Sequence, residues 1–411
     1  MSGRRVFITG MGFETPHGQD PRGVFERLFQ GESAVQMVRS GTAEFGSDVV
    51  LAPVDFDPGD TIPKVPLLFM ARAAQMAVVA AHKAIRSTGL LVDDRGPRDA
   101  GVYMGCGLGG AEIIQEGYRT FYEQKSKRFK RSTVPMIMAN AAAAHISMRY
   151  KIQGPAHTYS IACSSSTVAI GEAFRAVRDG YLEVAIAGGT EAMLNHGSIA
   201  AWERLGVLAR EHPDGVLASS RPFDAERTGF VLGEGAVILV IENEDRVSAR
   251  RATPVAEIIG YGSSSDAHNL IEPLADGQER TMWNGILDSG IDPGEVGYIN
   301  AHATGTPTGD PVEIDAIKRV FGAHARQLAV SSTKSMHGHL VGAAGALECA
   351  ITALALSEGR IPPTANLTTP DPACDLDCVP GVGRAVPDLA VAMSNSFAFG
   401  GSNATLVLRK A

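Results

Sequence analysis

One repeating pattern constrains the fold of this 411-residue chain more than any other feature. A short β-branched run, a glycine turn and an alanine-rich helical stretch follow one another from end to end. The predicted strands lie at residues 6–10, 101–105, 184–189, 236–241, 298–302, 328–331 and 390–394, and the clearest helices at 70–87, 164–179 and 342–358. This alternation predicts an α/β protein whose strands are buried on both faces.

Two helical stretches resemble each other. Residues 163–180 and 342–359 are each 18 residues long, begin with small residues, continue with a helical apolar period and end in a glycine suited to a helix C-terminus. Each follows a predicted strand. We therefore expect two similar halves, residues 1–250 and 251–411, with no flexible linker between them.

Composition excludes several classes of protein. Glycine is frequent, 46 of 411 residues or about 11% against a usual share near 7%, which fits tight turns in a folded body. The net charge of −8 argues against broad nucleic-acid binding. The N-terminus lacks the apolar core of a signal peptide, and no uninterrupted apolar run reaches the roughly 18 residues of a membrane span. We expect a cytoplasmic protein.

The most informative single segment is residues 159–167, in which a strand leads into Cys163 at the start of a helix. Free N–H groups and the helix dipole at such a position lower the pKa of a thiol and can hold an oxyanion. Taken alone, the segment fits a nucleophilic cysteine and a buried structural cysteine equally well. The five cysteines are odd in number and widely spread, so a disulfide framework is not expected.

Three further segments carry candidate residues. His302 ends a predicted strand before a Thr/Gly/Pro loop, where open α/β folds bind ligands, although most such histidines are merely hydrogen-bonded polar residues. Lys334, His337 and His339 precede a glycine-rich helix start. No third ligand accompanies the two histidines, so no metal site is predicted. Residues 395–403 form a strand and a glycine turn, which is either a ligand-facing loop or an ordinary turn.

Taken together and in this order, the four segments resemble the condensing β-ketoacyl synthases of the thiolase superfamily. The elongating type II (synthase II-like) enzymes are the most similar, and they include ketosynthase subunits of type II polyketide synthases. The likeness runs almost end to end, through RVFITGMG at 5–12, AGGTEAM at 187–193, RPFDAERTGFVLGEGA at 221–236 and PPTANL at 362–367. It implies a thiolase-like fold, in which two βαβ-rich halves form a five-layered α-β-α-β-α core.

The resemblance also implies roles. Cys163 matches the nucleophile that accepts the acyl group, His302 and His339 the two active-site histidines, and Lys334 the lysine that supports them. The reaction would be a decarboxylative condensation of that acyl group with malonyl-acyl carrier protein, giving a 3-oxoacyl product. No metal or organic cofactor is implied, because the two histidines would replace a Lewis acid, and the substrates would be delivered on the phosphopantetheine of an acyl carrier protein.

Several other residues match supporting positions of the family. Phe399, Gly400 and Gly401 correspond to a gating loop, with the Phe399 N–H helping to hold an oxyanion, and Asp266 belongs to a second loop that moves with it. Glu348 matches a carboxylate of the active-site network. A purely structural buried ion pair is an equal alternative for Glu348.

Departures from the family pattern concern the substrate and the partner. Ala398 stands where the fatty-acid enzymes usually have glycine, and residues 65–71 are apolar where those enzymes carry charged residues that help dock the carrier protein. A basic cluster could dock it instead, or could simply be a solvated face: Lys127, Arg128, Lys130 and Arg131. The expected acyl pocket includes Leu108, Thr133 and Trp202, the last two at usual phenylalanine positions.

A reshaped pocket with intact catalytic groups favours a specialised chain, such as a polyketide or polyene intermediate. Primary fatty-acid elongation by the same chemistry is the alternative. A non-catalytic chain-length subunit is a third, disfavoured by Cys163 and both histidines, and a thiolase would need a second cysteine near the C-terminus. We expect a homodimer or a heterodimer with a homologous chain-length-factor-like subunit.

Overall fold

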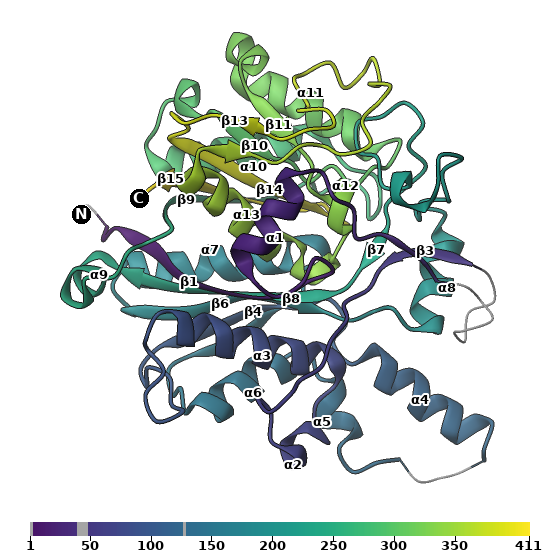
Figure 1. The fold of residues 1–411 in the computed structure, drawn as a ribbon, viewed down its shortest axis with the longest axis vertical. Coiled ribbons are helices and arrows are strands. Elements are labelled where there is room, and N and C mark those ends of the chain that lie inside the picture. The colour runs from purple at the N-terminus through teal and green to yellow at the C-terminus, as the bar shows by residue number, and fades with distance from the viewer. Residues whose placement is uncertain (1–2, 39–47, 126–128) are drawn as a thin grey trace.

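The computed structural model describes residues 3–38, 48–125 and 129–411 (Figure 1). The strands there are β1 Val6–Glu14, β2 Gln36–Val38, β3 Val49–Ala52, β4 Gly101–Gly105, β5 Ala156–Tyr159, β6 Val184–Glu191, β7 Leu232–Gly233, β8 Gly235–Asn243, β9 Ala256–Ser265, β10 Tyr298–Asn300, β11 Ala329–Ser331, β12 Arg360–Ile361, β13 Arg384–Ala385, β14 Val391–Ala398 and β15 Ser402–Lys410. The α-helices are α1 Pro21–Phe29, α2 Lys64–Leu67, α3 Arg72–Ser87, α4 Ala111–Tyr122, α5 Thr133–Ile137, α6 Ala141–Tyr150, α7 Ser165–Arg178, α8 His196–Leu205, α9 Glu244–Arg250, α10 Ala275–Ser289, α11 Gly309–Phe321, α12 Lys334–His337 and α13 Ala344–Glu358.

Ten of the strands share hydrogen bonds in the order β11-β10-β14-β15-β9-β1-β8-β6-β4-β5. The order repeats about the centre, where β1 and β9 pair antiparallel with Val6 opposite Ile258. On each side, the outer three strands are parallel and the next two pairs are antiparallel. Each half of the sheet therefore has the same internal topology.

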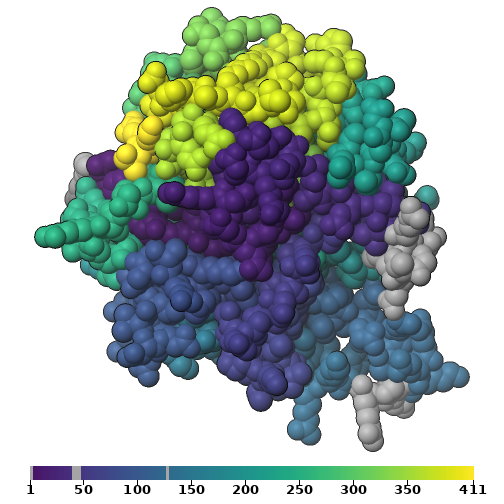
Figure 2. Space-filling model, in the orientation of Figure 1, coloured from purple at the N-terminus to yellow at the C-terminus, as the bar shows by residue number. Residues whose placement is uncertain are grey.

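Buried apolar side chains of the described residues form three large cores, each between layers of helices and strands. One core lies between helices α3 and α6 and the half of the sheet formed by β1, β8, β6, β4 and β5. Another lies between helices α10 and α11 and the half formed by β9, β15, β14, β10 and β11. The largest core surrounds α7 and α13, which contact strands of both halves and lie between them (Figure 1). These are the five layers of the thiolase-like fold. In the space-filling view, the purple N-terminal segment crosses the face between the blue and the yellow parts of the chain (Figure 2).

The two similar helix starts adopt the same backbone path. A residue with positive φ, Ala162 (44°) in one and Val341 (46°) in the other, leads into a short 3₁₀ turn and then into α7 or α13. The Thr167 and Ser396 hydroxyls lie 2.7 Å apart between the layers, and the Ala346 N–H donates to the Ser166 hydroxyl at 2.9 Å. Direct contact between the two helix starts explains why small residues fill both of them.

The predicted strands and helices are confirmed to within a few residues. The division into residues 1–250 and 251–411 stays a prediction. The small β2-β3-β7 sheet was not foreseen, because strands of two to four residues give too little periodicity to detect. Residues 341–358 are apolar enough for a membrane span, yet 89% of that window is buried within the fold. It is therefore the central core helix of the protein.

Candidate active site

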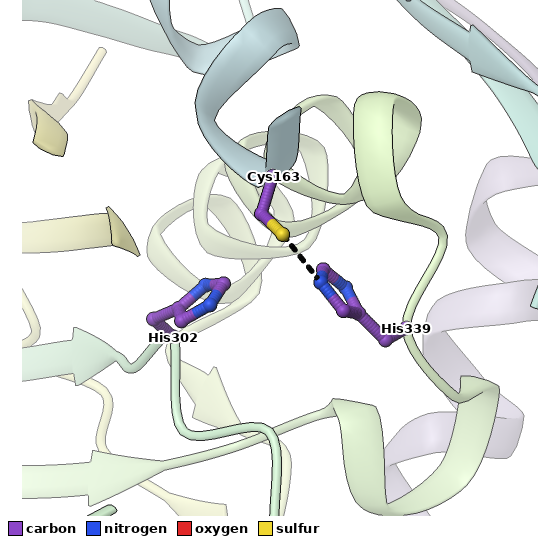
Figure 3. A group of neighbouring side chains, drawn as sticks. All are labelled: Cys163, His302 and His339. Carbon is purple, nitrogen blue, oxygen red and sulfur yellow. Dashed lines mark hydrogen bonds between the residues drawn. The ribbon is translucent and has the colours of Figure 1, made fainter. Parts of the chain in front are cut away.

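Cys163 lies in the 3₁₀ turn that opens α7 and points toward two imidazoles (Figure 3). Its Sγ is 3.0 Å from His339 Nε2, and one ligand-type atom from each of Cys163, His302 and His339 lies within 4.8 Å of the others. Side chains from both halves of the sequence thus meet at one point. All three side chains are at least nine-tenths shielded from solvent.

His302 follows β10 and is held by a carboxylate that sequence reasoning missed. The backbone N–H groups of His302 and Ala303 donate to Glu313 on α11, at 2.9 and 2.7 Å, and the Asn395 amide donates to the same carboxylate at 3.2 Å. Glu313 is fully buried. An acidic residue on the inward face of a helix just after the His302 loop was the available signal.

His339 is fixed through its backbone and its ring. Its N–H donates to the Val231 carbonyl at 2.7 Å, and its own carbonyl accepts from Gly233 at 2.9 Å, so it pairs with β7 like a short strand. The Phe230 ring meets the His339 ring edge-on at 5.3 Å, and the His302 ring stands nearly perpendicular to it at 5.4 Å. These contacts leave the imidazole little freedom to rotate.

Lys334 forms a fully buried ion pair with Glu348 on α13. The ordinary alternative for Glu348, a buried ion pair, is therefore present, and the Lys334 charge lowers the pKa of the Cys163 thiol whereas the Glu348 charge raises it. Burial raises the pKa of Glu348 to about 7, and Lys334 opposes that rise. The buried ion pair is thus present, and the part of Glu348 in an active-site network stays a prediction.

The electrostatics correct one expectation. Burial raises the pKa of the Cys163 thiol to about 12, and the opposing effects of the Lys334 charge and the Phe399 N–H do not compensate. The predicted lowering at a helix start is wrong because desolvation of a thiolate outweighs the N-terminal dipole here. Burial, assisted by Lys334, holds the pKa of both His302 and His339 well below the ordinary value. A neutral thiol thus faces two neutral imidazoles.

The hairpin between β14 and β15 lines the same cavity as the thiol. Gly400 and Gly401 have φ values of 84° and 66°, where a side chain would be strained. The Gly400 N–H donates to the Leu270 carbonyl at 2.7 Å, and the Asp266 N–H donates to Gly401 at 2.8 Å. Asp266 also accepts a 2.6 Å hydrogen bond from Asn403. The structure therefore joins the two predicted gate loops directly.

A cavity of about 340 Å³ reaches Cys163, His302 and His339. Trp202 lines it, stacking on Phe399 at 6.1 Å and meeting Phe230 edge-on at 5.5 Å, and its contact with the acyl chain stays a prediction. Leu108 and Thr133 do not line it in the single chain. Leu108 is 56% exposed, and Thr133 lies half-buried at the start of α5.

The expected docking residues are only partly described. Lys127 and Arg128 lie outside the described residues, whereas Lys130 and Arg131 are exposed. The apolar stretch at α2 is also at the surface, with Val65 68% and Leu68 71% exposed. Docking of the carrier protein on the basic cluster stays a prediction.

Among the described residues, Cys163, His302 and His339 form the group of donors that could ligate a metal ion. His337 does not join them. Its two ring nitrogens contact the Gly338 carbonyl and the Thr333 hydroxyl, at 2.7 and 3.0 Å. The adjacent positive charge of Lys334 disfavours a cation at this place, and a site without metal stays the prediction.

Comparison with known proteins decides the family. The profile of the β-ketoacyl synthase N-terminal domain matches residues 3–246, and that of the C-terminal domain matches residues 255–368. The chain belongs to the β-ketoacyl synthases. This β-ketoacyl synthase is 40% identical to nodulation protein E of Rhizobium sp. (strain N33), covering 99% of each chain. It is 39% identical to 3-oxoacyl-[acyl-carrier-protein] synthase 2 of Staphylococcus aureus (strain N315), covering 99% of this chain and 98% of the relative.

Among solved structures, the ishigamide ketosynthase/chain length factor superposes on this β-ketoacyl synthase with a TM-score of 0.92 at 33% identity, covering all of both chains. The protein is therefore a 3-oxoacyl-acyl carrier protein synthase, an acyltransferase that condenses acyl groups. The chain is therefore an enzyme and not the non-catalytic chain-length subunit that was the third alternative. Family and geometry agree that a cysteine and two histidines form the reaction centre.

Proposed function

We propose that Cys163 carries the growing acyl group and that His302 and His339 stabilise the enolate that extends it. The 3.0 Å contact between Cys163 Sγ and His339 Nε2, with His302 in the same triangle, is the observation that supports these roles. Lys334 and Glu348 maintain the electrostatic environment. In this assignment, each half of the fold contributes a different part of the reaction.

In the first step, Cys163 Sγ attacks the thioester carbonyl of an acyl carrier protein. The thiol proton ends on the carrier thiolate that leaves, so that His339 remains a neutral imidazole. The transient oxyanion is stabilised by backbone N–H groups, that of Phe399 among them. Because the pKa of the thiol is raised to about 12, its proton must be transferred during the attack.

In the second step, malonyl-acyl carrier protein loses carbon dioxide as its C–C bond to the carboxylate breaks. The electron pair becomes an enolate, whose oxygen accepts hydrogen bonds from the imidazole N–H groups of His302 and His339. The enolate carbon then attacks the Cys163 thioester and forms the new C–C bond. The C–S bond breaks, and the sulfur takes up a proton from water, which balances the loss of the carboxylate as carbon dioxide. Neutral imidazoles suit this role because each keeps an N–H to donate.

The acyl group is a specialised one, of the polyketide or polyene type. Trp202 supports this, because it forms a rigid aromatic wall with Phe399 and Phe230 at the gate. Ala398, beside the hinge glycines, adds a methyl group where the fatty-acid enzymes usually have none. The likeness to a ketosynthase/chain length factor pair points the same way. Primary fatty-acid elongation stays the alternative, favoured by the relative from Staphylococcus aureus.

The partners that fit are an acyl carrier protein and a second subunit of the same fold. Within the described residues, β5 ends the ten-stranded sheet and pairs with β4 alone. On α4, only Ala111 is buried, while Tyr118 and Tyr122 are 58% and 71% exposed. Thr133 begins α5, which contacts α4, so a second subunit, identical or homologous, on this surface would complete the pocket wall that Leu108 and Thr133 are expected to form.

A competition experiment tests the acyl class. The enzyme is incubated with a mixture of acyl carrier thioesters of different length and unsaturation, and the groups loaded on the Cys163 peptide are quantified by mass spectrometry. Preferred loading of unsaturated or oxygenated chains is expected. If saturated medium chains load best, the specialised assignment fails and primary elongation replaces it. Trp202→Phe, which restores the usual residue, should shift loading toward the saturated chains.

A further inference from the structure

The second half of the motif RPFDAERTGFVLGEGA at residues 221–236 holds His339, whereas its first half has no place in the chemistry above, yet that half contains a buried cation, Arg227, that bonds to a loop lining the cavity. The Arg227 guanidinium is almost fully buried. It donates to the backbone carbonyls of Thr306 and Pro307 at 3.0 and 2.9 Å. On its other side it donates to the Asp224 carbonyl and to the Asp371 carboxylate, both at 2.7 Å.

The loop that Arg227 holds forms one side of the cavity mouth. Residues 302–304 and 306–309 line the cavity, and Pro307 and Thr308 are exposed, as are three other lining residues, Gly206, Ile271 and Glu272. A substrate that enters between these exposed residues passes the 306–308 turn before it reaches Cys163. Arg227 does not line the cavity, so it acts on the substrate only through this loop.

The Asp310 carboxylate is a second charged group that holds the same loop. Asp310 is fully buried, accepts from the N–H groups of Gly305 at 3.1 Å and Phe223 at 2.8 Å, and lies 3.6 Å from Arg227 Nε. The loop is therefore tied at both ends to the segment that carries the motif. Buried charged networks of this kind fix one geometry, since any displaced group would be left unpaired.

We propose that Arg227 is a positioning residue that fixes the 306–308 side of the mouth, so that a thioester on a long pantetheine arm is directed onto Cys163. The inference rests on the proposed function, because it takes substrates to arrive on that arm. A displaced mouth weakens binding of the arm while the nucleophile itself stays intact. The loss then falls on KM for arm-bearing substrates rather than on the reactivity of the thiol.

Arg221 supplies a matched control within the same motif. It is equally buried and binds the Asp224 carboxylate at 3.0 Å, but its other hydrogen bonds go to Ala218 and Thr368, away from the mouth. Arg227→Gln, Arg227→Lys and Arg221→Lys are compared in the full-length enzyme. Each is assayed for self-acylation by an acyl carrier thioester and for alkylation of Cys163 by iodoacetamide, which carries no arm.

Arg227→Gln is expected to raise KM for the carrier thioester about ten-fold and to change kcat and the alkylation rate by less than about three-fold. Arg227→Lys, which keeps the positive charge, should raise KM less. Arg221→Lys should leave KM unchanged. The proposal would be overturned if Arg221→Lys raised KM as much as the Arg227 variants do. It would also be overturned if the alkylation rate fell by the same factor by which KM rose. If the Arg227 variants do not fold, Asp371→Asn releases the clamp from its half-exposed side, and an unchanged KM there also refutes it. Absent acylation of the wild-type enzyme would instead refute the proposed function.

Discussion

The two helix starts at the centre of the molecule have the same backbone conformation but differ in their chemistry. Ala162 and Val341 have nearly the same positive φ, and each leads through a 3₁₀ turn into a core helix. The next residue is Cys163 in the first and Gly342 in the second. A Cβ at Gly342 would come within 2.6 Å of the Glu191 carboxylate and of the Gly107 nitrogen.

The difference lies in what each turn faces. Cys163 faces a cavity with two imidazoles, whereas the Gly342 N–H donates at 3.2 Å to the buried Glu191, whose pKa burial raises to about 7. A strained turn at a helix start is therefore a property of the repeated fold. Its reactivity depends on open space and on neighbouring groups.

The largest expected effect is loss of the thiol. Cys163→Ala should reduce condensation by on the order of 10³-fold or more, while malonyl decarboxylation continues, because His302 and His339 are untouched. Product formation and carbon dioxide release are measured side by side. A cysteine moved to the other turn, in the Cys163→Ala/Gly342→Cys double variant, should not restore activity. Restored condensation would show that the two turns are equivalent after all.

Loss of one imidazole comes next. His339→Ala should slow malonyl decarboxylation by about 10²- to 10³-fold, the usual cost of removing one oxyanion donor. His337→Ala serves as the comparison, because His337 is equally buried but bonds only Gly338 and Thr333. An undiminished decarboxylation rate in His339→Ala would remove that residue from the mechanism.

The pH dependence of alkylation probes the thiol in its cavity. Since burial raises the pKa of Cys163 to about 12, the thiolate fraction grows ten-fold per pH unit below that value. The rate of reaction with iodoacetamide should therefore rise log-linearly with pH up to 9 and beyond. A plateau near pH 7 would mean that the helix start lowers the pKa as the isolated motif suggests, and the comparison of the two turns would need revision.

The smallest effect concerns packing between the turns. Gly345 occupies the place that Ser166 has in the first helix start, and a Cβ there would overlap the Thr167 hydroxyl and come within 2.9 Å of Ser396 Oγ. Gly345→Ala should lower the free energy of unfolding by about 1–3 kcal/mol, measured by chemical denaturation. At Gly206, where nothing lies within 4 Å, alanine should cost about 1 kcal/mol or less through its positive φ alone. Equal losses at both positions would contradict tight packing between the helix starts.

The strand and helix pattern, the duplicated turns and the candidate trio could all be predicted from the sequence, because each depends on local periodicity or on motifs that resemble a family. Glu313 and the Arg227 clamp could not, since their partners lie on other elements and meet only in the folded chain. The direction of the Cys163 pKa was wrong for a related reason. A helix start is visible in sequence, but the burial that outweighs its dipole is a property of the whole fold. Leu108 and Thr133 were expected in a wall that the single chain does not form.

The most direct test of the central claim is peptide mass spectrometry after incubation of the enzyme with an acyl carrier thioester. The account predicts one acyl group on the peptide that contains Cys163 and none in Cys163→Ala. Acyl transfer to Cys106, Cys349, Cys374 or Cys378, or a stable acyl group in the Cys163→Ala protein, would contradict it.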